Sequence, residues 1–156
     1  MPDKQALIDK GINGRVCDTL NDTTFISYLH FLSGKDFLSL SPKQYNKIDV
    51  LLELSSFRNI PNKVGKYNLI EYSYQHKKPS AGGYTWQYGD AVYNSFELDT
   101  ASVNTLEILD MSETGDEVFG VYNVHYVESS FYKTPGLAKY GIHLDFKDCY
   151  FRAKIK

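Results

Sequence analysis

The closing run of the chain alternates with a period of two between side chains suited to a core and side chains suited to water. The residues of one parity are apolar or small: Cys149, Phe151, Ala153 and Ile155. The residues of the other parity are polar or long: Tyr150, Arg152, Lys154 and Lys156. This is the pattern of an antiparallel β-strand with one buried face and one solvated face, and it favours an all-β protein.

The segments before this run also have the pattern expected for a strand, a turn and a second strand. VNTLEIL (103–109) is followed by the polar turn DMSETGDE (110–117) and by VFGVYNVHYV (118–127). GIHLDF (141–146) and CYFRAKI (149–155) are separated by Lys147-Asp148. Short strands, regular turn clusters and no clear long helix predict an antiparallel β-sandwich, with a flattened, lipocalin-like β-barrel as the alternative.

A chain of 156 residues predicts one domain with a core of its own. We expect residues 1–11 to be a flexible lead-in and residues 12–156 to form the β domain. Extended segments are predicted at 12–18 and 25–34. In 46–57 the even-numbered apolar residues are expected to face the core, with Asp49 and Glu53 on the opposite face, and 84–93 is predicted as one aromatic strand.

Charge and hydropathy exclude several classes of protein. The net charge is −2 and no large basic cluster is visible, so nucleic acid is not an expected partner. No stretch is long and apolar enough for a transmembrane segment, and the first residues do not form a signal peptide. The chain is then either cytoplasmic, or an exported protein whose signal is absent from this sequence.

The two cysteines, Cys17 and Cys149, allow two interpretations. In the first they are reduced and act as small buried apolar residues. In the second they form a disulfide between the first and last strands, which indicates an oxidising compartment. Their separation matches no zinc-site spacing.

The order of motifs resembles a family of uncharacterised Bacteroidota β-domains that are exported or lipid-anchored. The shared elements are Ile12-Asn13-Gly14, the central strand 48–54, Gly65-x-Tyr67-x-Leu69, Ala91-Val92-Tyr93, Leu106-x-Ile108 and 118–124. The resemblance implies a location in the cell envelope and a signal or lipid anchor outside this chain. It implies no active site and no cofactor, because the motifs are structural.

Catalytic motifs are absent from the sequence. There is no G-x-S-x-G elbow, and Cys149 lies in mid-strand on the predicted inner face, where a reactive thiolate is not expected. Asp90, Glu97 and Asp99 flank an aromatic strand and are the carboxylates to inspect for an acid/base pair. We expect a non-enzymatic protein, with an enzyme built on a spatially formed carboxylate pair as an alternative.

Metal-binding motifs are weak. His143 and Asp145 share a strand face but are expected to be solvated, and His125 is placed by parity among apolar residues as a hydrogen-bonded interior histidine. The turn 110–117 imitates the first half of a calcium loop but has Val121 at the position that requires glutamate. A hydrogen-bonded turn is favoured over a surface calcium site made by Asp110, Asp116 and Glu117, and no metal is predicted.

The strand 84–88 is the predicted binding surface. Tyr84, Trp86 and Tyr88 alternate and form a row on one face, with Gln87 and Asp90 nearby as polar partners. Such a row either stacks on a sugar or a protein partner or fills the core between two sheets. The predicted function is a binding or assembly module for an unknown glycan or protein, and the alternative is a carrier with an internal pocket for a small apolar ligand.

Overall fold

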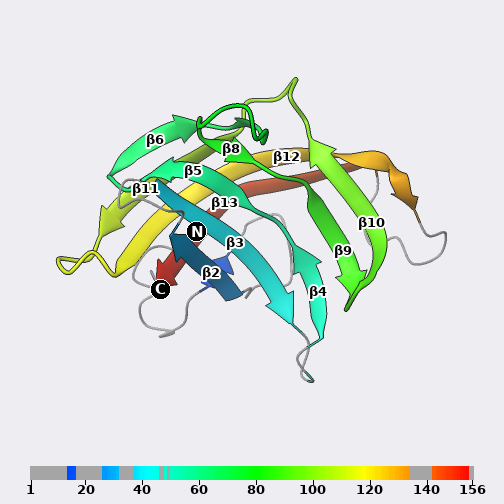
Figure 1. Cartoon of the computed structure of the whole chain (residues 1–156), viewed down its shortest axis with the longest axis horizontal. Helices are drawn as coiled ribbons and strands as arrows, with labels where there is room; N and C mark the ends of the chain where they lie inside the picture. The colour runs from blue at the N-terminus through cyan, green and yellow to red at the C-terminus, as the bar shows by residue number, and fades with distance from the viewer. Residues whose placement is uncertain are drawn as a thin grey trace.

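The computed structural model describes residues 14–16, 26–31, 37–45, 48, 50–133 and 142–154, and the predicted lead-in 1–11 lies outside them. Every regular element among these residues is a β-strand, which confirms the all-β class (Figure 1). None of the described residues forms a helix of the length and hydropathy needed to cross a bilayer.

The strands form two layers joined at a corner (Figure 1). The front layer contains β2 (Ile26–Phe31), β3 (Phe37–Tyr45), β4 (Leu51–Leu54), β5 (Phe57–Pro61), β7 (Ile70–Glu71) and β8 (Ser80–Ala81). The back layer contains β1 (Gly14–Val16), β6 (Gly65–Asn68), β11 (Thr105–Met111), β12 (Glu117–Lys133) and β13 (His143–Lys154). The hairpin of β9 (Tyr84–Tyr88) and β10 (Ala91–Leu98) makes the corner.

One hydrogen-bonded path connects the two layers in the order β1-β13-β12-β10-β9-β4-β3-β5-β8-β7. β2 pairs with β3, β11 with β12, and β6 with β11; of all these pairs only β7 and β8 run parallel. The path is not closed into a barrel, so the predicted sandwich is confirmed and the barrel alternative is wrong. Two register shifts in β10, at Tyr93 and Ser95, bend the strand where the sheet turns from one layer to the other.

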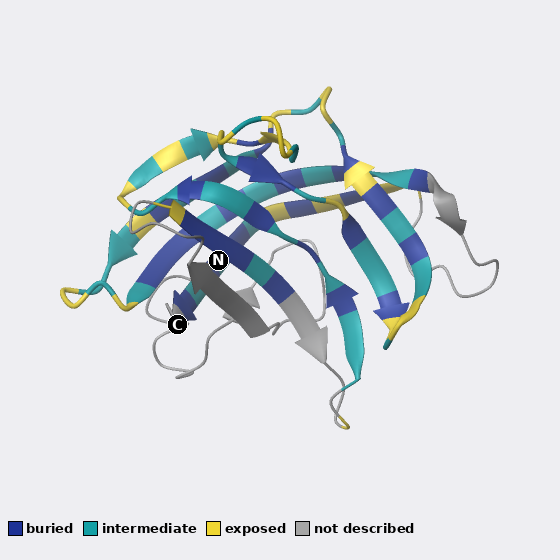
Figure 2. Ribbon diagram, in the orientation of Figure 1, coloured by how far each residue is buried: buried dark blue, intermediate teal, exposed yellow. Residues whose placement is uncertain are grey.

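Aromatic rings fill the space between the layers. Figure 2 shows buried positions, in dark blue, in the strands of both layers. Phe57 of the front layer lies 4.8 Å, centroid to centroid, from Tyr122 of the back layer. At the corner, the ring of Tyr84 lies 5.3 Å from that of Phe146. These tilted contacts across the interior bury large apolar surfaces, which is the main source of stability for a sandwich of this size.

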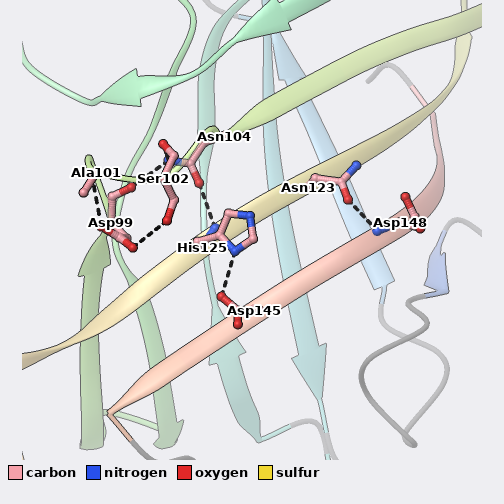
Figure 3. Close-up of polar contacts among 8 residues, drawn as sticks. All are labelled: Asp99, Ala101, Ser102, Asn104, Asn123, His125, Asp145 and Asp148. Carbon is pink, nitrogen blue, oxygen red and sulfur yellow. Dashed lines mark hydrogen bonds and ion pairs between the residues drawn. The ribbon is translucent and has the colours of Figure 1, made fainter.

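The Lys147-Asp148 pair is a bulge within β13, which runs continuously through it. Tyr122 pairs with Cys149, but Val124 pairs with Phe146, so one extra residue is accommodated opposite Asn123. Asp148 adopts a φ of 48° and its backbone N–H donates to Asn123 Oδ1 at 2.9 Å (Figure 3). The bulge changes the parity of the strand, so even-numbered residues face the core before it and odd-numbered residues after it.

Within the described residues, the side chains of the closing run lie on the two faces predicted for them. Cys149, Phe151 and Ala153 are buried, whereas Tyr150 and Arg152 are only partly so. Cys149 is also disulfide-bonded, and the sequence contains one other cysteine, Cys17, which lies outside the described residues. The interpretation of Cys149 as a free thiol is therefore wrong.

Two predictions about β-segments are corrected. The segment 84–93 is not one strand, because Gly89-Asp90 forms a two-residue turn with Gly89 at φ 58°. The parity predicted for 46–57 is also wrong: Ile48 is 72% exposed, whereas Glu53 is fully buried. The carboxylate of Glu53 accepts a hydrogen bond from the Tyr84 hydroxyl at 2.5 Å, and this partner reduces the cost of its burial.

Candidate functional site

The predicted aromatic row does not lie on one exposed face. Tyr84 is fully buried, Trp86 is partly buried and packs against the core, and Tyr88 is 46% exposed. Within the row itself, burial decreases from Tyr84 to Tyr88, toward the hairpin turn at Gly89-Asp90. Tyr84 is therefore a core residue, and only the end of the row is open to a partner.

The two polar residues predicted beside the row, Gln87 and Asp90, have different environments. Gln87 is buried, and its amide bridges Thr85 Oγ1 at 2.5 Å and the carbonyl oxygen of Gly89 at 2.6 Å. These contacts stabilise the hairpin turn, so the role of Gln87 is structural. Asp90 is exposed within the turn itself.

A groove of about 180 Å³ lies where β7, the end of β8 and the end of β10 meet. Its lining residues come from three segments distant in sequence: Glu71, Tyr72, Ala81, Gly82, Gly83, Glu97 and Leu98. The buried members, Ala81 and Leu98, form the floor, and the exposed Glu71 and Glu97 stand at the rim. We call this feature the Glu71–Glu97 groove.

Close backbone packing shapes the groove. The N–H of Tyr72 donates to the carbonyl oxygen of Ala81 at 3.0 Å, and that of Gly82 donates to Ser56 O at 2.9 Å. A Cβ at Gly82 would lie 2.5 Å from Ser56 Oγ, and one at Gly83 would lie 2.7 Å from the carbonyl oxygen of Phe96. The Gly-Gly pair thus lets β8 approach its neighbours without side chains in between.

Tyr72 gives the groove an aromatic wall. The guanidinium carbon of Arg58 lies 4.8 Å from the centroid of the Tyr72 ring, a cation–π contact. The ring of Tyr74, which is 94% exposed, meets Tyr72 edge-on at 5.4 Å. Tyr72 is therefore held by two neighbours in a fixed position at the edge of the groove.

The carboxylates of Glu71 and Glu97 have no counter-charge within the described part of the chain. Neither forms an ion pair or accepts a side-chain hydrogen bond from another described residue. His76 Nε2 lies 3.1 Å from the backbone oxygen of Glu71, and no hydrogen bond joins it to the Glu71 carboxylate. Both carboxylates are consequently available to a ligand.

A second polar arrangement lies on the outer face of β12 and β13 (Figure 3). His125 and Asp145 are cross-strand partners, and His125 Nδ1 lies 2.7 Å from Asp145 Oδ1. The N–H of His125 donates to Asn104 Oδ1 at 2.8 Å, and its carbonyl oxygen accepts from the N–H of Asp99 at 2.8 Å. His125 is about one-third exposed, so the prediction of an interior histidine is wrong.

Asp99 organises the turn beside His125. Its pKa lies below the ordinary value, chiefly because Ser102 Oγ donates a hydrogen bond of 2.7 Å to Asp99 Oδ2. Desolvation opposes this shift, whereas the backbone N–H of Ala101 and the charges of His125 and His143 lower the pKa further. The carboxylate is therefore held ionised as the cap of a tight turn.

This outer-face arrangement lacks the parts of a catalytic or metal site. Ser102 donates its hydroxyl proton to Asp99, so it is not aligned with His125 as a nucleophile. No group of three histidine, cysteine or acidic side chains among the described residues converges to hold a metal ion. The His125–Asp145 pair is best explained as a cross-strand contact that fixes β13 against β12.

The turn 110–117 stabilises itself with its own side chains. Ser112 Oγ donates to Asp116 Oδ1 at 2.7 Å and accepts from the N–H of Glu117 at 3.0 Å. Glu117 also pairs with Arg152 at 2.5 Å. The carboxylates considered for calcium are thus directed to different partners, and Asp110 accepts from the N–H of Met111 at 2.8 Å.

A hollow in the described part of the core is too small for the predicted apolar ligand. The hollow lined by Leu40, Phe57, Tyr122 and Phe151 is too small to hold one water molecule. The aromatic packing described above fills this part of the core.

Sequence reasoning singled out Glu97 but missed Glu71, Tyr72 and the groove that unites them. A signal was present in Glu71-Tyr72-Ser73-Tyr74, an acidic and aromatic alternation followed closely by Gly82-Gly83. What could not be read was the parallel pairing of β7 with β8, which brings Glu71 opposite Ala81. Comparison with protein families, with curated proteins and with solved structures finds no match to this chain.

Proposed function

We propose that the protein is a non-enzymatic binding module of the cell envelope, and that the Glu71–Glu97 groove holds one ring of a carbohydrate ligand. The observation that carries this proposal is the combination of an aromatic wall with two unpartnered carboxylates around one concave site. Concave sites with a few convergent polar groups are the usual places where small ligands bind.

Each part of the groove suits a sugar. Tyr72 presents apolar ring surface for C–H groups, and the carboxylates of Glu71 and Glu97 accept hydrogen bonds from hydroxyls. The volume of about 180 Å³ is below the roughly 300–1,000 Å³ of pockets that enclose drug-sized ligands. A single ring, with the rest of the oligosaccharide outside, fits these dimensions.

The envelope location is supported by the cysteine chemistry. Cys149 is disulfide-bonded, and disulfides persist mainly in oxidising compartments such as the periplasm and the cell surface. The resemblance to exported Bacteroidota β-domains points in the same direction. A cytoplasmic location would leave the disulfide without an oxidant.

Isothermal titration with a panel of neutral and charged oligosaccharides tests the proposal. Tyr72→Ala should weaken binding about tenfold, because one stacking residue contributes roughly 1–2 kcal/mol. Tyr88→Ala is the matched control, since Tyr88 belongs to the row on β9 and not to the groove. Loss of binding in Tyr88→Ala with normal binding in Tyr72→Ala would move the site to the end of β9, and no binding by any sugar would reject the proposal.

The enzyme alternative has one observation in its favour, because Glu71 and Glu97 line the same groove as a glycosidase pair would. Both side chains are exposed, however, whereas a general acid works from a site that excludes water. We therefore favour binding over hydrolysis. Release of reducing ends from a bound oligosaccharide, abolished by Glu97→Gln, would reverse this choice.

A further inference from the structure

We infer that His76 makes the Glu71–Glu97 groove sensitive to pH. Neutral His76 closes the segment 71–78, which carries the aromatic wall of the groove, and protonation of His76 opens this segment and weakens ligand binding. The part of the inference that concerns binding rests on the proposed function, whereas the change in the segment itself does not. The basis is a pair of hydrogen bonds that only the neutral form of the ring can make.

The imidazole of His76 bridges the two ends of this segment. His76 Nε2 lies 3.1 Å from the carbonyl oxygen of Glu71, and the backbone N–H of Lys78 donates to His76 Nδ1 at 3.3 Å. A carbonyl oxygen only accepts and a backbone N–H only donates, so Nε2 carries the proton and Nδ1 carries none. We call this pair of contacts, which fixes one neutral tautomer, the His76 bridge.

A second proton on the ring would break one half of the His76 bridge. It would bind at Nδ1, where the N–H of Lys78 already points, and two donors would then face each other. The contact with the carbonyl oxygen of Glu71 would remain. The carbonyl oxygen of Lys78 still accepts from Asn59 Nδ2 at 3.4 Å, so the segment opens around His76 without leaving the sheet. Histidine is the side chain whose charge ordinarily changes between about pH 5 and 8, a physiological range.

The segments around His76 carry charges of both signs. The groups are Glu71, Lys77 and Lys78 on its own segment, Arg58 on β5 and Glu97 on β10. The two carboxylates favour the protonated ring and the three cations oppose it. All of them except the half-buried Arg58 are exposed, so solvent screens their effect. The hydrogen bond at Nδ1 is therefore the feature that separates the two forms of the ring.

The His76 bridge matters to the groove because Tyr72 lies within the closed segment. On one side Tyr72 is held by the bond of its N–H to Ala81 and by Arg58, and these contacts do not involve His76. On the other side its ring meets Tyr74, which belongs to the segment that the bridge closes. Opening the bridge therefore loosens the Tyr74 side of the wall and leaves the rest, so binding should weaken without being lost.

The test measures binding at about pH 7.5 and about pH 5.5 with neutral tetramers of glucose and of N-acetylglucosamine, whose charge does not change with pH. We expect about two- to tenfold weaker binding at the acidic pH, as the loss of one hydrogen bond gives. His76→Gln does not titrate in this range and should bind equally at both pH values. His143→Gln is the matched control, since His143 is exposed on β13 outside the groove lining and its loss should leave the pH dependence intact.

Nitrogen-15 NMR of the histidine rings and the backbone amides tests the His76 bridge without any ligand. At neutral pH the spectra should show His76 as the Nε2–H tautomer. The amide signal of Lys78 should shift with the same midpoint as the His76 ring. In His76→Gln the Lys78 signal should no longer change over this pH range.

The outcomes separate the inference from the function on which part of it rests. The Nδ1–H tautomer, or a Lys78 amide that does not follow the titration of His76, would overturn the inference. Equal wild-type affinity at both pH values, or pH dependence that persists in His76→Gln, would also overturn it while the carbohydrate-binding proposal stands. Failure of wild-type protein to bind any sugar would reject the proposed function and the effect on binding, and the NMR titration would then decide the change in the segment by itself.

Discussion

The hydroxyl of Tyr84 donates a 2.5 Å hydrogen bond to the carboxylate of Glu53, and both side chains are fully buried. The contact joins β9 to β4 at the corner of the sandwich, next to the cross-strand pair Glu53 and Trp86. A buried carboxylate is tolerated only when its oxygens are hydrogen-bonded, so Tyr84 serves the core twice, through its ring and through its hydroxyl.

Tyr84→Phe removes this hydroxyl and leaves the ring in place. We expect a loss of about 1–3 kcal/mol in the free energy of unfolding, because a donor to a buried carboxylate is lost. Urea denaturation measures the change. Tyr88→Phe, at a side chain that is 46% exposed, should stay within about 0.5 kcal/mol of wild type. Equal effects of the two variants would contradict the assignment.

The two glycines of the groove should respond differently to a methyl group. Gly83→Ala places its Cβ against the backbone carbonyl of Phe96, which cannot rotate away, so about 1–3 kcal/mol of destabilisation is expected. Gly82→Ala meets only the hydroxyl of Ser56, which a rotamer change or Ser56→Ala can remove. Thermal melts of Gly83→Ala and of Gly82→Ala, each with and without Ser56→Ala, check this order, and rescue of Gly83→Ala by Ser56→Ala would refute it.

Asp99 is expected to titrate below its ordinary value of 3.8. Its pKa is lowered on folding, so its stabilising contribution is present above the unfolded pKa and disappears as the pH falls through the folded pKa. Ser102→Ala removes the largest cause and should raise the Asp99 pKa toward the ordinary value, as followed by carboxyl NMR. Ser112→Ala, in the distant turn 110–117, should leave the Asp99 titration unchanged.

Reduction should destabilise the protein. A disulfide typically contributes about 2–4 kcal/mol, mainly by constraining the unfolded chain. We expect a lower melting temperature in the presence of a reductant for wild type, and no further change for Cys149→Ala. A melting temperature of wild type that is indifferent to complete reduction, verified by mass spectrometry, would show that the disulfide adds no stability.

The extended segments were predictable because strand periodicity is a local property of the sequence. The alternation Cys149, Phe151, Ala153 predicted the inner face of β13, and these residues are buried. Prediction failed where one residue shifts the parity or reverses the chain, as at the turn Gly89-Asp90. It failed again at Glu53, where a charged residue was assumed to face water and a distant tyrosine provides its partner.

The amino-acid sequence by itself therefore determined the all-β class, the inner face of the last strand and the absence of a familiar catalytic motif, since each follows from residue type and short-range spacing. Only the tertiary structure decided which carboxylates share a groove and which aromatic residues belong to the core. Glu71, Gly82 and Glu97 line one groove because β7 pairs with β8 and because β10 turns the corner of the sandwich. Such long-range pairings depend on how the whole chain packs its apolar surface, so they cannot be predicted from short-range periodicity.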